Sequence, residues 1–182
     1  KIKSKVMDFN IEKGDQKRIV IVGGGFGGLE LAKNLRKTGM QIVLIDKHNY
    51  HQFQPLIYQV ASAGMEPSSI SFPYRRIFQK YKNLYFRLAE VKQIDVKNKK
   101  VITSIGSVSY DYVVLAAGAT SNFFGNKEIE KGSMAMKSLS EAARIRNTVL
   151  ANIERAITTE DPVFRQELLN IVVVGGGATG VE

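Results

Sequence analysis

Uninterrupted apolar runs mark the start of the patterned part of this chain. Residues 19–22 and 42–45 consist of isoleucine, valine and leucine, which is typical of parallel strands that are covered on both faces. Between these runs, Leu29, Ala32 and Leu35 lie at the spacing of one helical face. The pattern therefore predicts a strand, a helix and a second strand, which together form one βαβ unit.

The middle of the chain changes from helical to strand patterning. Residues 49–64 show no sustained period. A second helix is predicted to open at Pro73 and to run through Tyr81, because proline is favoured in the first turn of a helix. Residues 84–116 predict a series of strands, of which the last, 112–116, returns to the buried core.

A long amphipathic helix is predicted in the last third of the chain. Ser138 and Glu141 have the capping-box spacing that opens a helix, and apolar residues recur on one stripe along the residues that follow. Residues 158–170 are expected to be a polar connector. A second β-branched run at 171–174 predicts another strand.

Two of the apolar runs lead into glycine-rich turns with the spacing G-x-G-x-x-G. These turns are residues 23–28 and residues 175–180. A strand before such a turn is the context in which the pattern binds a dinucleotide. The alternative is a tight corner between strand and helix with no ligand. Two turns of this kind imply two dinucleotides, and hence electron transfer between two cofactors.

The glycines of the first turn have separate roles in this interpretation. Gly23 permits the tight bend, Gly25 lets a pyrophosphate approach bare backbone, and Gly28 allows the helix to pack closely on the strand. The amides at the helix start then face the phosphates. Candidate cofactor-binding residues at the helix start are Phe26 and Gly27, and those of the second turn are Gly175, Gly177 and Gly180.

The ends of two predicted strands complete the candidate site. Asp46 lies about 20 residues after the glycine turn, where an acid accepts both hydroxyls of an adenosine ribose. Residues 116–120 close a strand with small side chains, which lets a ligand lie against the backbone. The alternatives are an ordinary strand-end aspartate and a simple strand exit.

Composition limits the function classes. The net charge of +9 favours anionic partners, but the basic residues are scattered and no nucleic-acid recognition fold accompanies them, so nucleic-acid binding is not expected. Cysteine is absent, which excludes a disulfide, a CxxC pair or a thiolate metal site in this chain. His48 and His51 lack the spacing of helical metal ligands, so no metal site is expected. No segment is apolar enough to span a bilayer.

Length sets the domain organisation that we expect. A dinucleotide-binding domain needs about 150 residues, so 182 residues hold one domain and the entrance to another, and we expect a piece of a longer protein. Residues 1–17 are polar and basic and predict a loose tail. The further divisions are a first nucleotide-binding domain at 18–137, a helix and connector at 138–170, and the start of a second domain at 171–182.

Four longer segments are more specific than the glycine turns alone. They are residues 19–46, 49–61 (NYHQFQPLIYQVA), 110–125 (YDYVVLAAGATSNFFG) and 172–182 (VVVGGGATGVE). Together they closely resemble the type II NADH dehydrogenases, which are single-subunit NADH:quinone oxidoreductases with the two-dinucleotide fold of glutathione reductase. Ala178 is a small departure, because proline is common there in the family.

The resemblance implies an α/β fold with a Rossmann-like FAD-binding domain and only the first strand and glycine turn of the NADH-binding domain. FAD would bind at the first turn and NADH at the second. The resemblance places Lys47 near the ribose, Val91 at the adenine, Gln54, Pro55 and Leu56 beside the flavin, Ala117 and Gly118 along the cofactor, and Glu182, the catalytic candidate, at the contact of nicotinamide and flavin.

The expected function of the parent protein is to pass two electrons from NADH through FAD to a membrane quinone. We expect it at the cytoplasmic face of the cell membrane, held peripherally by a later part of the chain, and we expect the 182-residue chain itself to be soluble and inactive. Two alternatives remain open at this point: a reductase of a soluble ferredoxin-like acceptor, and a non-catalytic nucleotide-binding module. A homodimer and the choice between NADH and NADPH are also open.

Overall fold

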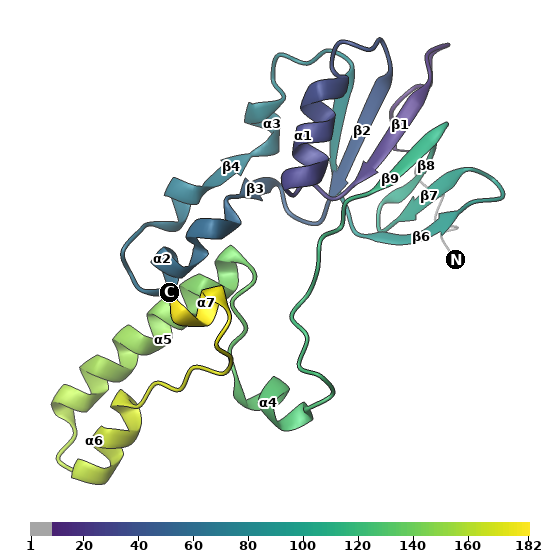
Figure 1. Ribbon diagram of the computed structural model, residues 1–182. Coiled ribbons are helices and arrows are strands. Elements are labelled where there is room, and N and C mark those ends of the chain that lie inside the picture. The colour runs from purple at the N-terminus through teal and green to yellow at the C-terminus, as the bar shows by residue number, and fades with distance from the viewer. Residues whose placement is uncertain (1–8) are drawn as a thin grey trace, which may run out of the picture. The chain divides into compact units, whose positions relative to one another are not determined.

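The computed structural model describes residues 9–182, which fall into two compact units (Figure 1). The first unit comprises residues 9–51 and 72–119, and the second comprises residues 52–71 and 120–182. The domain boundaries expected from the sequence stay a prediction.

The first unit is built mainly from strands. Its helices are α1 (Phe26–Leu35) and α3 (Tyr74–Ile77). Its strands are β1 (Arg18–Val22), β2 (Gln41–Asp46), β5 (Leu84–Leu88), β6 (Val91–Asp95), β7 (Lys100–Thr103), β8 (Gly106–Ser109) and β9 (Tyr112–Leu115), and the chain changes unit within β3 (Tyr50–Gln52) and β4 (Ser71–Pro73).

The central sheet is parallel and has the strand order β5-β2-β1-β9. This is the third, second, first and fourth parallel strand in chain order, the arrangement of a Rossmann half-domain. The predicted βαβ unit is confirmed. Strand β9 returns to the core as predicted, because Val113 and Val114 pack against the two core clusters, but it lies at the sheet edge, so Tyr112 and Leu115 are exposed.

Alternate residues of the central strands build two separate cores, because successive side chains of a strand point to opposite faces. One face packs against α1 and α3 through Ile19, Ile21, Ile42 and Leu44. The other packs against residues of the antiparallel sheet β6-β7-β8 through Val20, Val22, Val43 and Ile45. The sheet is therefore covered on both faces, as the unbroken apolar runs predict (Figure 1).

Part of the predicted tail belongs to the core. The side chains of Phe9 and Ile11 are 3% and 6% exposed and join the cluster on the β6-β7-β8 face. Arg18 Nη2 donates to the Ile11 carbonyl at 2.9 Å, and Arg87 Nε donates to the Phe9 carbonyl at 3.0 Å. The expectation of a loose tail is wrong for this stretch, because two apolar side chains suffice to anchor it, while residues 1–8 lie outside the described part of the chain.

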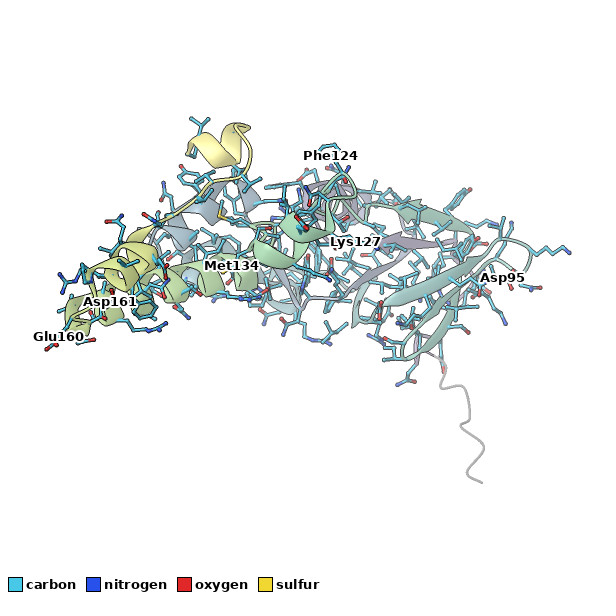
Figure 2. All side chains as sticks on the ribbon, turned by 90° about the horizontal axis from the view of Figure 1, so that it is seen from below. Asp95, Phe124, Lys127, Met134, Glu160 and Asp161 are labelled. Carbon is cyan, nitrogen blue, oxygen red and sulfur yellow. The ribbon has the colours of Figure 1, made fainter. Side chains whose placement is uncertain are left out.

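The second unit is helical. Its helices and turns are η1 (Gln54–Leu56), α2 (Ile57–Ala61), η2 (Pro67–Ile70), α4 (Lys127–Gly132), α5 (Leu139–Thr158), α6 (Pro162–Leu169) and α7 (Ala178–Val181). The predicted capping box is confirmed, because Ser138 and Glu141 satisfy each other's backbone amides at the start of α5. Figure 2 labels Asp161, directly before the first residue of α6, and Asp95, the last residue of β6.

Helix α6 corrects the expected polar connector. The Asp161 side chain accepts hydrogen bonds from the Val163 and Phe164 amides, and Pro162 follows at the first helical position. An aspartate N-cap followed by proline is a strong helix start, and this signal outweighs the polar composition. Helix α3 is also corrected, since it ends at Ile77 instead of continuing through Tyr81.

The apolar run before the second glycine turn does not form the predicted strand. Residues 171–174 belong to no strand, and their exposed fractions run from 62% to 83%. A parallel strand needs hydrogen-bonding neighbours, and no described segment pairs with this run. Among residues 9–182, no helix has both the length and the apolar character needed to cross a membrane.

The exposed run at 171–174 predicts that the isolated 182-residue chain self-associates. An extended segment with apolar side chains and unpaired backbone N–H and C=O groups tends to pair with another chain. Replacing Val172 and Val174 by lysine should shift sedimentation profiles toward the monomer. Val96→Lys is the matched control, since Val96 is 75% exposed but lies in the turn after β6 and does not belong to an apolar run. A monomeric wild-type chain at high concentration would contradict this expectation.

Candidate functional site

The first glycine turn joins β1 to α1 and has little room for side chains at Gly23, Gly24 and Gly28. Gly23 has a φ of +100°, and a Cβ there would lie 2.3 Å from the Ala116 carbonyl oxygen. A Cβ at Gly28 would lie 1.9 Å from the Gly23 carbonyl oxygen. At Gly25, by contrast, no heavy atom comes within 4 Å of the Cβ position. The turn is therefore tight on its inner side and open at Gly25.

Asp46 lies at the end of β2 directly beside this turn. Its Oδ2 accepts a hydrogen bond from the Gly24 amide at 2.7 Å, and its Oδ1 accepts one from the His48 amide at 2.7 Å. Two backbone donors hold the carboxylate in one orientation, while 14% of its side chain stays exposed. An oriented, partly open carboxylate at a strand end is suited to accept hydrogen bonds from ribose hydroxyls.

Other predicted residues of the first unit lie around the same strand ends. The backbone at Ala116 and Ala117 lies beside Gly23, and Gly118 follows with a φ of +72°. Lys47 is exposed next to Asp46. The Ala89 amide donates to the Asp46 carbonyl at 2.9 Å, which brings the chain segment leading to Val91 beside β2.

The turn also has two buried polar contacts that the sequence did not predict. The Tyr74 hydroxyl donates to the Gly24 carbonyl at 2.7 Å, and His51 Nδ1 lies 3.1 Å from the same oxygen. Tyr74 lies in the core, at 2% exposure, and its hydroxyl reaches a residue 50 positions away, a contact that no local pattern signals.

Burial and charge both act on the tyrosines near Asp46. Burial, followed by the negative charge of Asp46, raises the pKa of Tyr74 far above its ordinary value. The same two causes raise the pKa of Tyr50. For Tyr74, a side-chain interaction with Asp46 is a third cause of the raised pKa.

The remaining predicted residues belong to the second unit. Gln54, Pro55 and Leu56 form the short turn η1, and Glu182 is an exposed residue after α7. The second glycine turn repeats the geometry of the first: Gly175 has a φ of +109°, and a Cβ at Gly180 would lie 2.1 Å from the Gly175 carbonyl oxygen. Gly177 precedes α7 as Gly25 precedes α1, with the same open space at its Cβ position.

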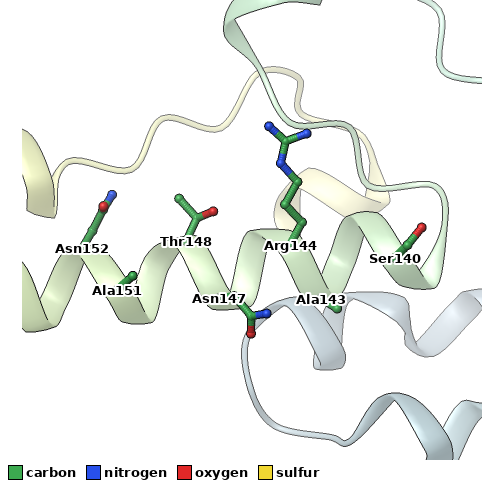
Figure 3. A pocket seen from close by; sticks show the side chains of 7 residues that line it. All are labelled: Ser140, Ala143, Arg144, Asn147, Thr148, Ala151 and Asn152. Atoms are coloured by element: carbon green, nitrogen blue, oxygen red, sulfur yellow. The ribbon is translucent and has the colours of Figure 1, made fainter.

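A separate hollow lies along α5 (Figure 3). The residues that line it are Ser140, Ala143, Arg144, Asn147, Thr148, Ala151 and Asn152. None of them is a predicted site residue. Within residues 9–182, no cluster of three histidine or acidic side chains could hold a metal ion.

A family model described as pyridine nucleotide-disulphide oxidoreductase matches residues 17–182, nearly the whole chain. The chain belongs to this family. The expected α/β fold with a Rossmann-like parallel sheet is thereby confirmed. Unlike the disulphide reductases that give the family its name, this pyridine nucleotide-disulphide oxidoreductase chain contains no cysteine.

Specific relatives in this family support the resemblance seen in the sequence. Two type II NADH:quinone oxidoreductases of Mycobacterium tuberculosis are 38% and 39% identical to the chain, over 91% and 93% of its length. The chain covers 36% and 37% of those two proteins. The structure of NDH2 from Plasmodium falciparum in complex with NADH matches with a TM-score of 0.76 at 22% identity, over 84% of this chain and 32% of that one.

Proposed function

We propose that the complete natural protein is a FAD-dependent NADH:quinone oxidoreductase that passes two electrons from NADH to a membrane quinone. The observation that carries the proposal is the identity of 38% and 39% to type II NADH:quinone oxidoreductases over almost the whole chain. Because the chain spans about a third of the length of those relatives, the activity belongs to the complete protein.

The first unit fits the adenosine and pyrophosphate of FAD. Open backbone at Gly25 admits a pyrophosphate, and the start of α1 provides amides and a positive dipole end for it. Asp46 would hold the ribose, with Lys47 beside it, and the backbone at Val91 would meet the adenine. FAD, when bound, supplies a ring system that takes up two electrons and passes them on.

The second unit supplies the entrance to the NADH site. Gly177 is open as Gly25 is, and the tight contact between Gly180 and Gly175 reproduces the corner of the first turn. By the family resemblance, Gln54, Pro55 and Leu56 of this unit would line the flavin. Since the chain has no cysteine, these 182 residues contribute no dithiol between flavin and acceptor.

The place of the protein is part of this proposal. A quinone acceptor dissolves in the bilayer, so the enzyme must approach the membrane surface from the side where NADH is found. We therefore assign it to the cytoplasmic face of the cell membrane as a peripheral member of the respiratory chain. Membrane contact would come from residues outside these 182.

The test is an acceptor assay on the complete natural protein. NADH oxidation should depend on added quinone, and heat-released flavin should co-migrate with FAD on chromatography. A rate that depends on a ferredoxin and not on quinone would support the reductase of a soluble carrier instead. Recovery of FMN alone would contradict the assignment of Asp46 and Val91 to an adenosine.

Glu182 gives a kinetic prediction for the complete protein. If its carboxylate lies where nicotinamide meets flavin, Glu182→Gln should keep the fold and the bound FAD while slowing flavin reduction by NADH about tenfold, which corresponds to about 1.4 kcal/mol of barrier. Stopped-flow absorbance measures this rate. Glu160→Gln, the same change at an exposed position between α5 and α6, is the control. A wild-type rate with unchanged NADH affinity would make Glu182 only a residue at the end of a helix.

A further inference from the structure

The Gly24 residue of the first turn is held on both of its backbone polar groups. Its amide donates to Asp46 Oδ2 at 2.7 Å. Its carbonyl accepts from the Tyr74 hydroxyl at 2.7 Å and lies 3.1 Å from His51 Nδ1. A carbonyl oxygen only accepts hydrogen bonds, so the contact with His51 requires the tautomer that carries its proton on Nδ1.

The orientation of the Gly24 carbonyl fixes the orientation of the next amide. The described chain has no cis peptide bond, and in a planar trans peptide the C=O of one residue and the N–H of the next point in opposite directions. The Gly24 carbonyl points inward to Tyr74 and His51, both of which are buried. The Gly25 N–H must therefore point away from Tyr74 and His51, and the Cβ position at Gly25 is open as well.

The packing of Tyr74 keeps this arrangement rigid. Its ring lies 4.9 Å from the ring of Phe86 and 6.2 Å from that of Phe78, measured between centroids. A Cβ at Gly24 would lie 2.3 Å from the Tyr74 hydroxyl oxygen, so the tyrosine occupies the space that any side chain at position 24 would need. His51 is held in turn by an edge contact with the ring of Phe26, at 5.2 Å between centroids.

We propose that Tyr74 and His51 are positioning residues that hold the Gly24–Gly25 peptide so that the Gly25 amide donates to the pyrophosphate of the bound dinucleotide. The inference rests on the proposed function, because the dinucleotide at this turn is FAD. It adds a requirement to the glycine pattern: the orientation of the Gly24–Gly25 peptide is held by a tyrosine 50 residues after Gly24.

The test compares Tyr74→Phe with Tyr81→Phe in the complete natural protein. Tyr81 is a matched control, because it packs against Phe78 as Tyr74 does but its hydroxyl only accepts from Arg36 at the surface. FAD-free protein is titrated with FAD, and the ³¹P resonances of the bound pyrophosphate are recorded. Tyr74→Phe should weaken FAD binding by up to about tenfold, because the free turn loses a contact that pre-organises the Gly25 amide, and should shift the ³¹P resonances. Tyr81→Phe should change neither.

A second variant keeps the test decisive if Tyr74→Phe fails to fold. His51→Ala removes the other donor to the Gly24 carbonyl and should shift the same ³¹P resonances. If the wild-type protein binds FAD and both variants match it in affinity and resonances, the positioning role is wrong while the proposed function stands. If the wild-type protein binds no FAD, the proposed function itself is wrong.

Discussion

Gly28→Ala is expected to destabilise the first unit by about 3 kcal/mol and to abolish retention of FAD by the complete natural protein. The added Cβ would lie 1.9 Å from the Gly23 carbonyl oxygen, and this neighbour is backbone that cannot rotate away as a side chain could. Helix α1 must then move away from β1. The expected loss of about 3 kcal/mol is at the upper end of the usual cost of overpacking a core. Chemical denaturation of the FAD-free protein and the FAD content after purification measure the two effects.

The neighbouring glycine provides the stability control. At Gly27 no heavy atom lies within 4 Å of the Cβ position, and the residue is in the first turn of the same helix. Gly27→Ala should therefore raise the free energy of unfolding slightly, by up to about 1 kcal/mol, because alanine is the better helix former. Equal stability of the two variants would contradict the close packing of helix on strand at Gly28.

Asp46→Ala is expected to weaken FAD binding by about 1–3 kcal/mol, the range for a lost hydrogen bond to a charged group. The substitution removes the candidate ribose acceptor, and it also leaves the Gly24 and His48 amides without their carboxylate partner. Loss of stability should therefore accompany the loss of affinity. Titration of FAD-free protein with FAD gives the dissociation constant, and denaturation gives the stability.

The control for Asp46 is an aspartate with the same structural task elsewhere. Asp161 also accepts hydrogen bonds from two backbone amides, those of Val163 and Phe164 at the start of α6. Asp161→Ala should cost about 1 kcal/mol of stability, as the loss of an N-cap does, without changing the affinity for FAD. If both variants lower stability and neither changes the affinity, Asp46 is only a structural residue.

The parts of the fold that the sequence predicts are those set by local patterns. The runs at 19–22 and 42–45 each have four consecutive apolar side chains, and a sheet that is covered on both faces buries all of them in its two cores. The Ser138 and Glu141 capping box lies within four residues, so its outcome does not depend on the rest of the chain. The two glycine turns also follow from their local pattern. Gly23 and Gly175 both have a positive φ, and the last glycine of each turn packs against the carbonyl of the first.

The parts that the sequence missed depend on distant partners or on competing signals. Phe9 and Ile11 stand among polar residues, and only the sheet they cover reveals their burial. Residues 171–174 have the composition of a strand but lack neighbours to pair with. The contact of Tyr74 with Gly24 spans 50 positions and is the part of the candidate site that no pattern in the sequence could supply.

The most direct test of the central claim is an absorbance spectrum of the complete natural protein, recorded without oxygen before and after NADH is added, and again after a quinone. The purified protein should show flavin absorbance bands, NADH should bleach these bands, and quinone should restore them. A protein without flavin bands, or one whose bound flavin NADH does not bleach, would contradict the central claim.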